Sequence, residues 1–106
     1  MMENKEFLYT IQPTRAEMLE NGPTPKEQRI IGLHYNYLKD LTENSIVILA
    51  GRTQTIDPTS FGIVIYKALS EERAREIMEK DPAVKEGVFS AKLFPFKVSL
   101  FNKYYS

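Results

Sequence analysis

Residues 24–51 read TPKEQRIIGLHYNYLKDLTENSIVILAG, a capped amphipathic helix followed by a short apolar strand. Thr24 suits the N-cap, Pro25 the first helical position, and Glu27, three residues after the cap, completes a capping box. One stripe then recurs at spacings of four, four and three residues, formed by Ile30, His34, Leu38 and Leu41. This spacing predicts a helix to about Leu41 or Glu43, with the stripe facing a core.

The strand of this stretch, Ser45–Ala50, is β-branched-rich and has five consecutive apolar residues before Gly51. Such a run predicts a strand that is buried on both faces. A loop over Arg52–Ser60 leads to the next predicted strand, Phe61–Ala68. This link is longer than the roughly 2–5 residues of common hairpin loops, and long loops often carry function.

The flanking segments complete the pattern on both sides. Alternation at Phe7, Tyr9 and Ile11 predicts a strand over Glu6–Gln12, followed by a loop with a short helical turn at 16–19. After the hairpin, Ser70 caps a second helix that ends at Asp81-Pro82, and a last strand follows at 88–96. The order predicts an α+β, ferredoxin-like βαββαβ fold with a four-stranded antiparallel sheet. The alternative is an unrelated α+β meander.

Composition limits the possible chemistry. A chain of 106 residues forms one domain, 1–106, with a core at about 6–97 and an aromatic tail at 98–106. With no cysteine and one histidine, disulfides, thiolate zinc sites and multi-histidine metal sites within one subunit are excluded. We therefore expect no metal and no cofactor. The polar N-terminus and the absence of a long apolar run favour a cytoplasmic protein. The 14 basic residues balance the 14 acidic ones, which disfavours nucleic acid and membrane as partners.

The sheet predicted here has one face without a helix, and that face is not consistently polar. Residues 46–50 and 63–66 offer apolar side chains to both faces. In the ferredoxin-like order the strand at 45–50 also lies at an edge, where a long apolar strand needs a cover. A second copy, packed sheet against sheet, is the cover we expect, with the tail available to cross to it. The alternative is that the aromatic tail covers the face of its own chain.

Several motifs resemble the YciI-like (YCII-related) family, over roughly residues 27–97. The helix at 34–41 is similar to the family's H-x-x-[YH]-L-x-x-L pattern, and Ile48-Leu49-Ala50-Gly51 resembles its L-x-A-G strand end. The most specific piece is 81–89, DPAVKEGVF, which resembles the D-P-[FY]-V-x-x-G-[VL]-[FY] turn. Departures are Arg52 where the family commonly has proline, Ala83 where it has an aromatic, and the added tail.

The resemblance implies a dimeric α/β-barrel-like assembly with a small-molecule pocket that uses the matched residues, His34 and Asp81. Most members have no assigned activity, and a few similar proteins are linked to lyase-type chemistry, including elimination of chloride from aromatic substrates. Departures at Arg52 and Ala83 imply a pocket that differs from those of the relatives.

His34 is unusual on physical grounds, because it is a titratable group on the apolar stripe of the best-capped helix. Asp81 stands at the end of the other helix, on the same side of the predicted sheet. If the two meet, the carboxylate orients the imidazole, and the second ring nitrogen can remove or deliver a proton. Two structural readings stay open. His34 bonds a backbone carbonyl in the core, or Asp81 serves only as the N-cap of a helical turn before Pro82.

The remaining candidates are substrate-binding side chains. Arg52, which opens the long loop, suits an anionic group, and Tyr9 and Tyr37 suit the wall of a pocket, although core aromatics and an exposed loop arginine are the simpler readings. We expect a lyase or isomerase with His34 as acid/base; the alternative is a non-catalytic metabolite-binding or accessory dimer domain. A cofactor-free monooxygenase is a third class, without distinctive residues. No nucleophile elbow or glycine-rich fingerprint is present.

Overall fold

Four strands form one antiparallel sheet, in the order β2-β3-β1-β4, in the computed structural model, which describes residues 4–105. The elements follow the chain as β1 Lys5–Pro13, α1 Glu17–Asn21, α2 Pro25–Glu43, β2 Val47–Arg52, β3 Gly62–Ala68, α3 Glu71–Lys80, α4 Pro82–Lys85 and β4 Phe89–Phe96. The first three residues and Ser106, which the predicted domain and tail include, lie outside the described residues. The predicted ferredoxin-like α+β fold is confirmed.

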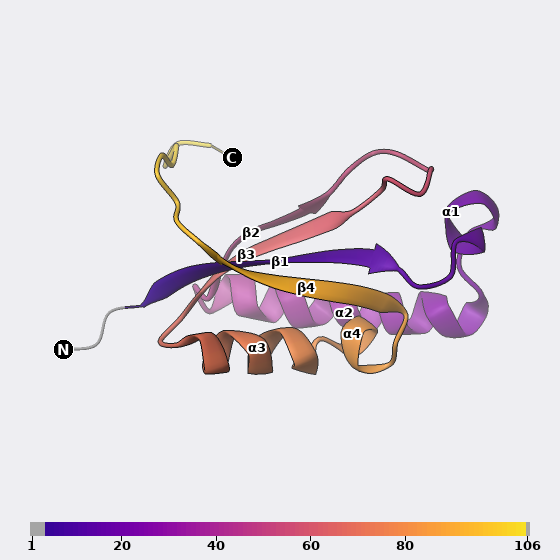
Figure 1. The fold of residues 1–106 in the computed structure, drawn as a ribbon, viewed down its shortest axis with the longest axis horizontal. Coiled ribbons are helices and arrows are strands. Elements are labelled where there is room, and N and C mark those ends of the chain that lie inside the picture. Colours follow the sequence, from indigo (N-terminus) through magenta and orange to yellow (C-terminus); the bar gives the residue numbers. More distant parts are fainter. Residues whose placement is uncertain (1–3, 106) are drawn as a thin grey trace.

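Helices α2, α3 and α4 cover one face of the sheet, and the opposite face carries no helix (Figure 1). The two predicted caps are present. Thr24 and Glu27 form the capping box of α2, and the Ser70 hydroxyl accepts a hydrogen bond from the Arg73 amide at 3.1 Å. Within residues 4–105 no helix is both long and apolar enough to cross a membrane.

The core lies between the sheet and the helices, where alternate strand residues point. Tyr9, Tyr66 and Val64 are its largest fully buried side chains besides Asp81. The rings of Tyr9 and Tyr66 meet edge to face, with centroids 5.5 Å apart, which is a favourable aromatic geometry. β1 thus places the hydroxyl of Tyr9 on the side of the sheet that the helices cover.

Strand β2 differs from the prediction that it is buried on both faces. Of the residues of β2 only Val47 is buried within one chain, and Leu49 is 50% exposed. The reason is position: β2 pairs only with β3 and forms an edge of the sheet, so its outer side has no neighbour. The register shifts between Val47 and Leu49, an irregularity typical of edge strands.

One row of large apolar side chains crosses the face that carries no helix. In register across all four strands lie Leu49, Ile65, Leu8 and Phe94. We call the face of the sheet that carries no helix the open face. The sheet is not closed into a barrel within the chain, since β2 and β4 end the order.

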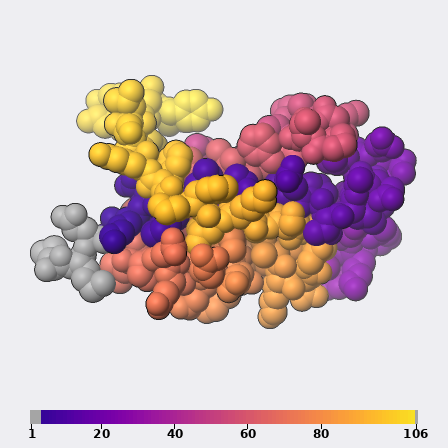
Figure 2. Space-filling model, in the orientation of Figure 1, coloured from indigo at the N-terminus to yellow at the C-terminus, as the bar shows by residue number. Residues whose placement is uncertain are grey.

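The C-terminal tail does not fold back as a cover for the open face. It leaves β4 and extends beyond the sheet (Figures 1 and 2). Its large side chains are 67–94% exposed: Leu100, Phe101, Tyr104 and Tyr105. At the base of the tail, the amide of Val98 donates a hydrogen bond to the Glu6 carboxylate at 2.8 Å.

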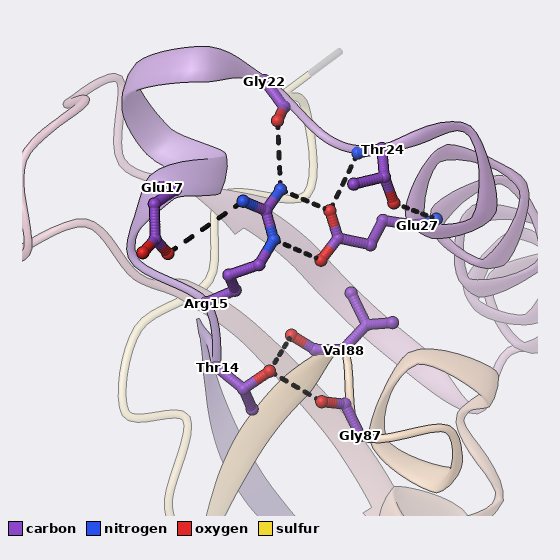
Figure 3. A network of polar contacts seen from close by, with 8 residues as sticks. All are labelled: Thr14, Arg15, Glu17, Gly22, Thr24, Glu27, Gly87 and Val88. Atoms are coloured by element: carbon purple, nitrogen blue, oxygen red, sulfur yellow. Dashed lines mark hydrogen bonds and ion pairs between the residues drawn. The ribbon is translucent and has the colours of Figure 1, made fainter.

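The long connection between β1 and α2 is held by a polar network (Figure 3). The Arg15 guanidinium donates twice to Glu27, at 2.9 and 2.7 Å, while the same carboxylate accepts the Thr24 amide at 2.8 Å. Thr14 donates to the carbonyls of Gly87 and Val88, at the turn before β4. The network therefore ties the start of α2 to the segment that follows α4. The Arg15 and Thr24 bonds hold the pKa of Glu27 at about 2.

Candidate functional site

Asp81 occupies the sharp junction between α3 and α4. Its backbone N–H donates to Met78 and closes α3, while its side chain accepts the Ala83 amide at 3.0 Å and caps α4. Pro82 starts α4 without needing a donor, which suits the first helical position. The N-cap reading of Asp81 is therefore present in the structure. It accounts for only one of the side chain's contacts.

The Asp81 carboxylate is completely buried and surrounded by donors. Its Oδ2 accepts the Tyr9 hydroxyl at 2.8 Å, and its Oδ1 accepts the Ala83 amide. Nδ1 of His34 lies 2.8 Å from both oxygens. A buried acid requires such compensation, because its desolvation is costly when it has no partner. Helices α2 and α4 and strand β1 thus meet at one carboxylate.

His34 places its ring between this carboxylate and open space. Its side chain is 12% exposed, and its edge meets the ring of Phe89 at 5.3 Å between centroids. No described residue hydrogen-bonds the second nitrogen, Nε2. The reading of His34 as a ring bonded to a backbone carbonyl is not what the structure shows, since its partner is a side-chain carboxylate 47 residues away.

The open space is a cleft of about 730 Å³ between α2 and the edge strand β2. A cleft of this size falls in the range of small-molecule sites. Its lining is mainly apolar, with His34 on one wall. The apolar lining includes Ile31, Leu38, Ile48, Leu49, Val64 and Phe89. Arg52, Lys39 and Glu43 add charge, and Tyr105 of the tail also borders the cleft.

The structure separates the predicted site residues into two groups. His34 and Asp81 meet, and Arg52 shares the cleft with His34. Tyr9 and Tyr37 are not among the cleft-lining residues. Tyr9 is buried on Asp81, and the hydroxyl of Tyr37 donates to the carbonyl of Ile77 at 2.7 Å.

Burial keeps both of these hydroxyls protonated. It is the main cause that raises the pKa of Tyr9, and the charge of Asp81 adds to the effect. Burial likewise raises the pKa of Tyr37 to about 12, again with a contribution from Asp81. Both side chains therefore act as hydrogen-bond donors at neutral pH.

Sequence reasoning missed the contact of Tyr9 with Asp81. The available signal was the alternation of β1, which places Tyr9 on the face of the sheet that the helices cover. Alternation does not say which helix residue lies opposite Tyr9. Among residues 4–105, no three histidine, aspartate or glutamate side chains gather closely enough to hold a metal ion. The arrangement is suited to moving a proton through a single imidazole.

The fold and the site define a ferredoxin-like α+β domain with a histidine–aspartate pair beside an apolar cleft. The chain belongs to the YCII-related family, whose domain matches residues 6–97. Among solved structures it is similar to 5-chloro-2-hydroxyhydroquinone dehydrochlorinase from Burkholderia phenoliruptrix, in complex with 2,5-dihydroxybenzoquinone. The identity is 18% and the TM-score 0.61, over 86% of this chain and 93% of that one. No curated protein sequence matches the chain.

Proposed function

We propose that the chain is a small-molecule lyase or isomerase in which His34 transfers a proton and Asp81 orients it. One observation carries the proposal: the imidazole has one nitrogen on a fully buried carboxylate and lies on the wall of a cleft. An oriented imidazole in a largely apolar site is the apparatus that proton abstraction needs. We expect this chemistry in the cytoplasm.

In an elimination, Nε2 of His34 takes a proton from the substrate. The electron pair of the broken bond forms the new double bond, and the leaving group departs with the electrons of its own bond. Asp81 stays on Nδ1 and stabilises the imidazolium that forms. In an isomerisation the same nitrogen returns the proton at another atom. Neither course needs an oxidant or a second substrate.

The lining of the cleft supports an apolar or aromatic substrate with a small polar or anionic group. Apolar walls bury the body of such a molecule, and Arg52 provides a cation at the same cleft. The dehydrochlorinase of similar fold adds support for an elimination from a hydroxylated ring, and we extend that class of reaction to this chain as part of the proposal.

The test is turnover of a panel of halogenated and hydroxylated aromatic compounds by wild type and His34→Gln. The expected result is halide release or a shifted ultraviolet spectrum with wild type, at a rate about 10²–10⁴-fold higher than with the variant. Asn36→Gln, on the exposed side of α2, is the control and should equal wild type. Unchanged turnover in folded His34→Gln would contradict the mechanism. Ligand binding without turnover of any compound would favour the non-catalytic metabolite-binding domain.

We also propose that two copies pair through their open faces and form a barrel-like homodimer. The row of Leu49, Ile65, Leu8 and Phe94 supports this, because its two ends, Leu49 and Phe94, are exposed and the two residues between them are partly exposed, and a contiguous apolar row open to solvent is unusual on a monomer. Two leucines allow a matched test by sedimentation. Leu49 on the open face is 50% exposed and Leu33 on α2 is 47% exposed. Leu49→Lys should give the mass of one chain, and Leu33→Lys the mass of two. A wild-type mass of one chain at micromolar concentration would refute the pairing.

A further inference from the structure

We propose that Tyr9 is a positioning residue that keeps Asp81 ionised, so that a proton taken from the substrate stays on His34. The inference deepens the proposed function and rests on it. The sequence pattern predicts Tyr9 to form part of the wall of a substrate pocket. Its hydroxyl instead lies 2.8 Å from Oδ2 of Asp81, and Tyr9 is not among the residues that line the cleft.

The argument starts from the donors around the carboxylate. The Ala83 amide can only donate, and it is fixed on Oδ1 by the first turn of α4. The Tyr9 hydroxyl is completely buried, and no described residue other than Asp81 accepts a hydrogen bond from it. Two fixed donors stabilise the charged form of a carboxyl group over the neutral form, because a hydrogen bond to an ionised acceptor is stronger than one to a neutral acceptor.

This preference decides where the transferred proton rests. When His34 and Asp81 together hold one proton that can be shared, it sits either on the ring, giving imidazolium and carboxylate, or on the acid, giving two neutral groups. Each hydrogen bond from Tyr9 or Ala83 favours the carboxylate. Loss of the Tyr9 bond therefore shifts the pair toward the neutral arrangement, in which Nδ1 accepts a proton from the acid instead of donating one.

The polar groups around Asp81 come from three elements, β1, α2 and α4, and of the two nearby tyrosines only Tyr9 donates to the carboxylate. Tyr9 approaches from β1, and His34 and Tyr37 approach from α2. The Tyr37 hydroxyl is engaged by the carbonyl of Ile77 at 2.7 Å, so its own bond does not reach the carboxylate. Charged residues Lys39, Glu43 and Arg52 border the cleft rather than the carboxylate. Because burial raises the pKa of Tyr9, its hydroxyl keeps its proton and remains a hydrogen-bond donor at neutral pH.

Nuclear magnetic resonance tests this directly, because the chain has a single histidine and its ring signals are unambiguous. The variant is Tyr9→Phe, which removes one oxygen and keeps the ring. Tyr66→Phe is the matched control, since Tyr66 is equally buried and its hydroxyl donates to the Ala74 carbonyl at 2.7 Å, away from the site. Samples labelled with ¹⁵N and ¹³C are titrated from pH 8 to pH 4, without any substrate.

In wild type and Tyr66→Phe we expect both ring nitrogens to show imidazolium shifts in the protonated state, while the Asp81 carboxyl carbon keeps its carboxylate shift. In Tyr9→Phe we expect Nδ1 to move toward the unprotonated type, and the carboxyl carbon toward the protonated shift at a higher pH than in wild type. Identical spectra for Tyr9→Phe and Tyr66→Phe would overturn the proposal.

The wild-type protein alone provides a second test, which does not depend on the folding of a variant. If its Asp81 carboxyl carbon takes on the protonated shift as His34 gains a proton, Tyr9 does not keep the acid ionised, and the inference fails. The outcome is independent of turnover. A protein with the expected spectra but no activity on any compound keeps the role of Tyr9 and loses only the proposed reaction.

Discussion

Asp81→Ala should lower the free energy of unfolding by about 2–4 kcal/mol, although it removes only a few atoms. The structure provides the terms. Without the carboxylate, the completely buried Tyr9 hydroxyl loses its partner, at a cost of about 1–3 kcal/mol. The loss of the cap on α4 adds about 1 kcal/mol. His34 is partly exposed and can rehydrate, so we assign it no cost.

Removing the buried charge also removes its desolvation cost, which places the expected loss near the lower end, about 2 kcal/mol. For a domain of this size that corresponds to a fall in melting temperature of at least about 8 °C. The assay is urea unfolding followed by circular dichroism, at one fixed protein concentration because a dimer makes stability concentration-dependent.

Asp40→Ala is the control. Asp40 is exposed on α2, and its replacement should change stability by no more than about 0.5 kcal/mol. If Asp81→Ala matches this control within error, with an unchanged slope against urea, the carboxylate does not hold its three partners as described, and the reasoning about the site is wrong.

Three further predictions concern two helix caps and one tyrosine. The pKa of Glu27 falls from 4.5 to about 2 on folding, so its contribution is complete at neutral pH and is lost as the pH falls from 4.5 toward 2; Glu27→Gln should be less stable than wild type at pH 7 and equal to it near pH 2 in thermal melts. Ser70→Ala should cost about 1 kcal/mol in urea unfolding through loss of the α3 cap, and a change below about 0.3 kcal/mol would contradict that cap. Since burial raises the pKa of Tyr37 from 10 to about 12, the unfolded chain loses that proton first; Tyr37→Phe should therefore lose less stability than wild type between pH 10 and 12.

Much of the fold was predictable because its signals are local. The capping box at Thr24 and Glu27 and the cap at Ser70 depend on residues three positions apart, and both are present as expected. The alternation of β1 and the order of elements then leave few topologies with right-handed crossovers. That topology places both helices on one side of the sheet, so a contact between His34 and Asp81 could be suggested although the two residues are 47 positions apart.

The rest could not be predicted because it depends on contacts between distant segments. The apolar run of β2 predicts burial, but its exposure within the chain follows from its place at the sheet edge. The sequence gives no way to tell the roles of Tyr9 and Tyr37 apart. Only the structure shows that the Tyr9 hydroxyl donates to Asp81 and the Tyr37 hydroxyl to the carbonyl of Ile77. The bidentate contact of Arg15 with Glu27 also has no signal in the sequence, because an arginine in a loop is part of no periodic pattern and its partner lies 12 residues away.

The most direct measurement is single-turnover kinetics of His34→Gln against wild type, on the first aromatic compound from the panel that wild type converts. Proton transfer by His34 predicts that the chemical step slows by about 10²–10⁴-fold while the substrate dissociation constant stays within a few-fold of wild type. A chemical step of equal rate in the folded variant would contradict His34 as the proton-transferring group.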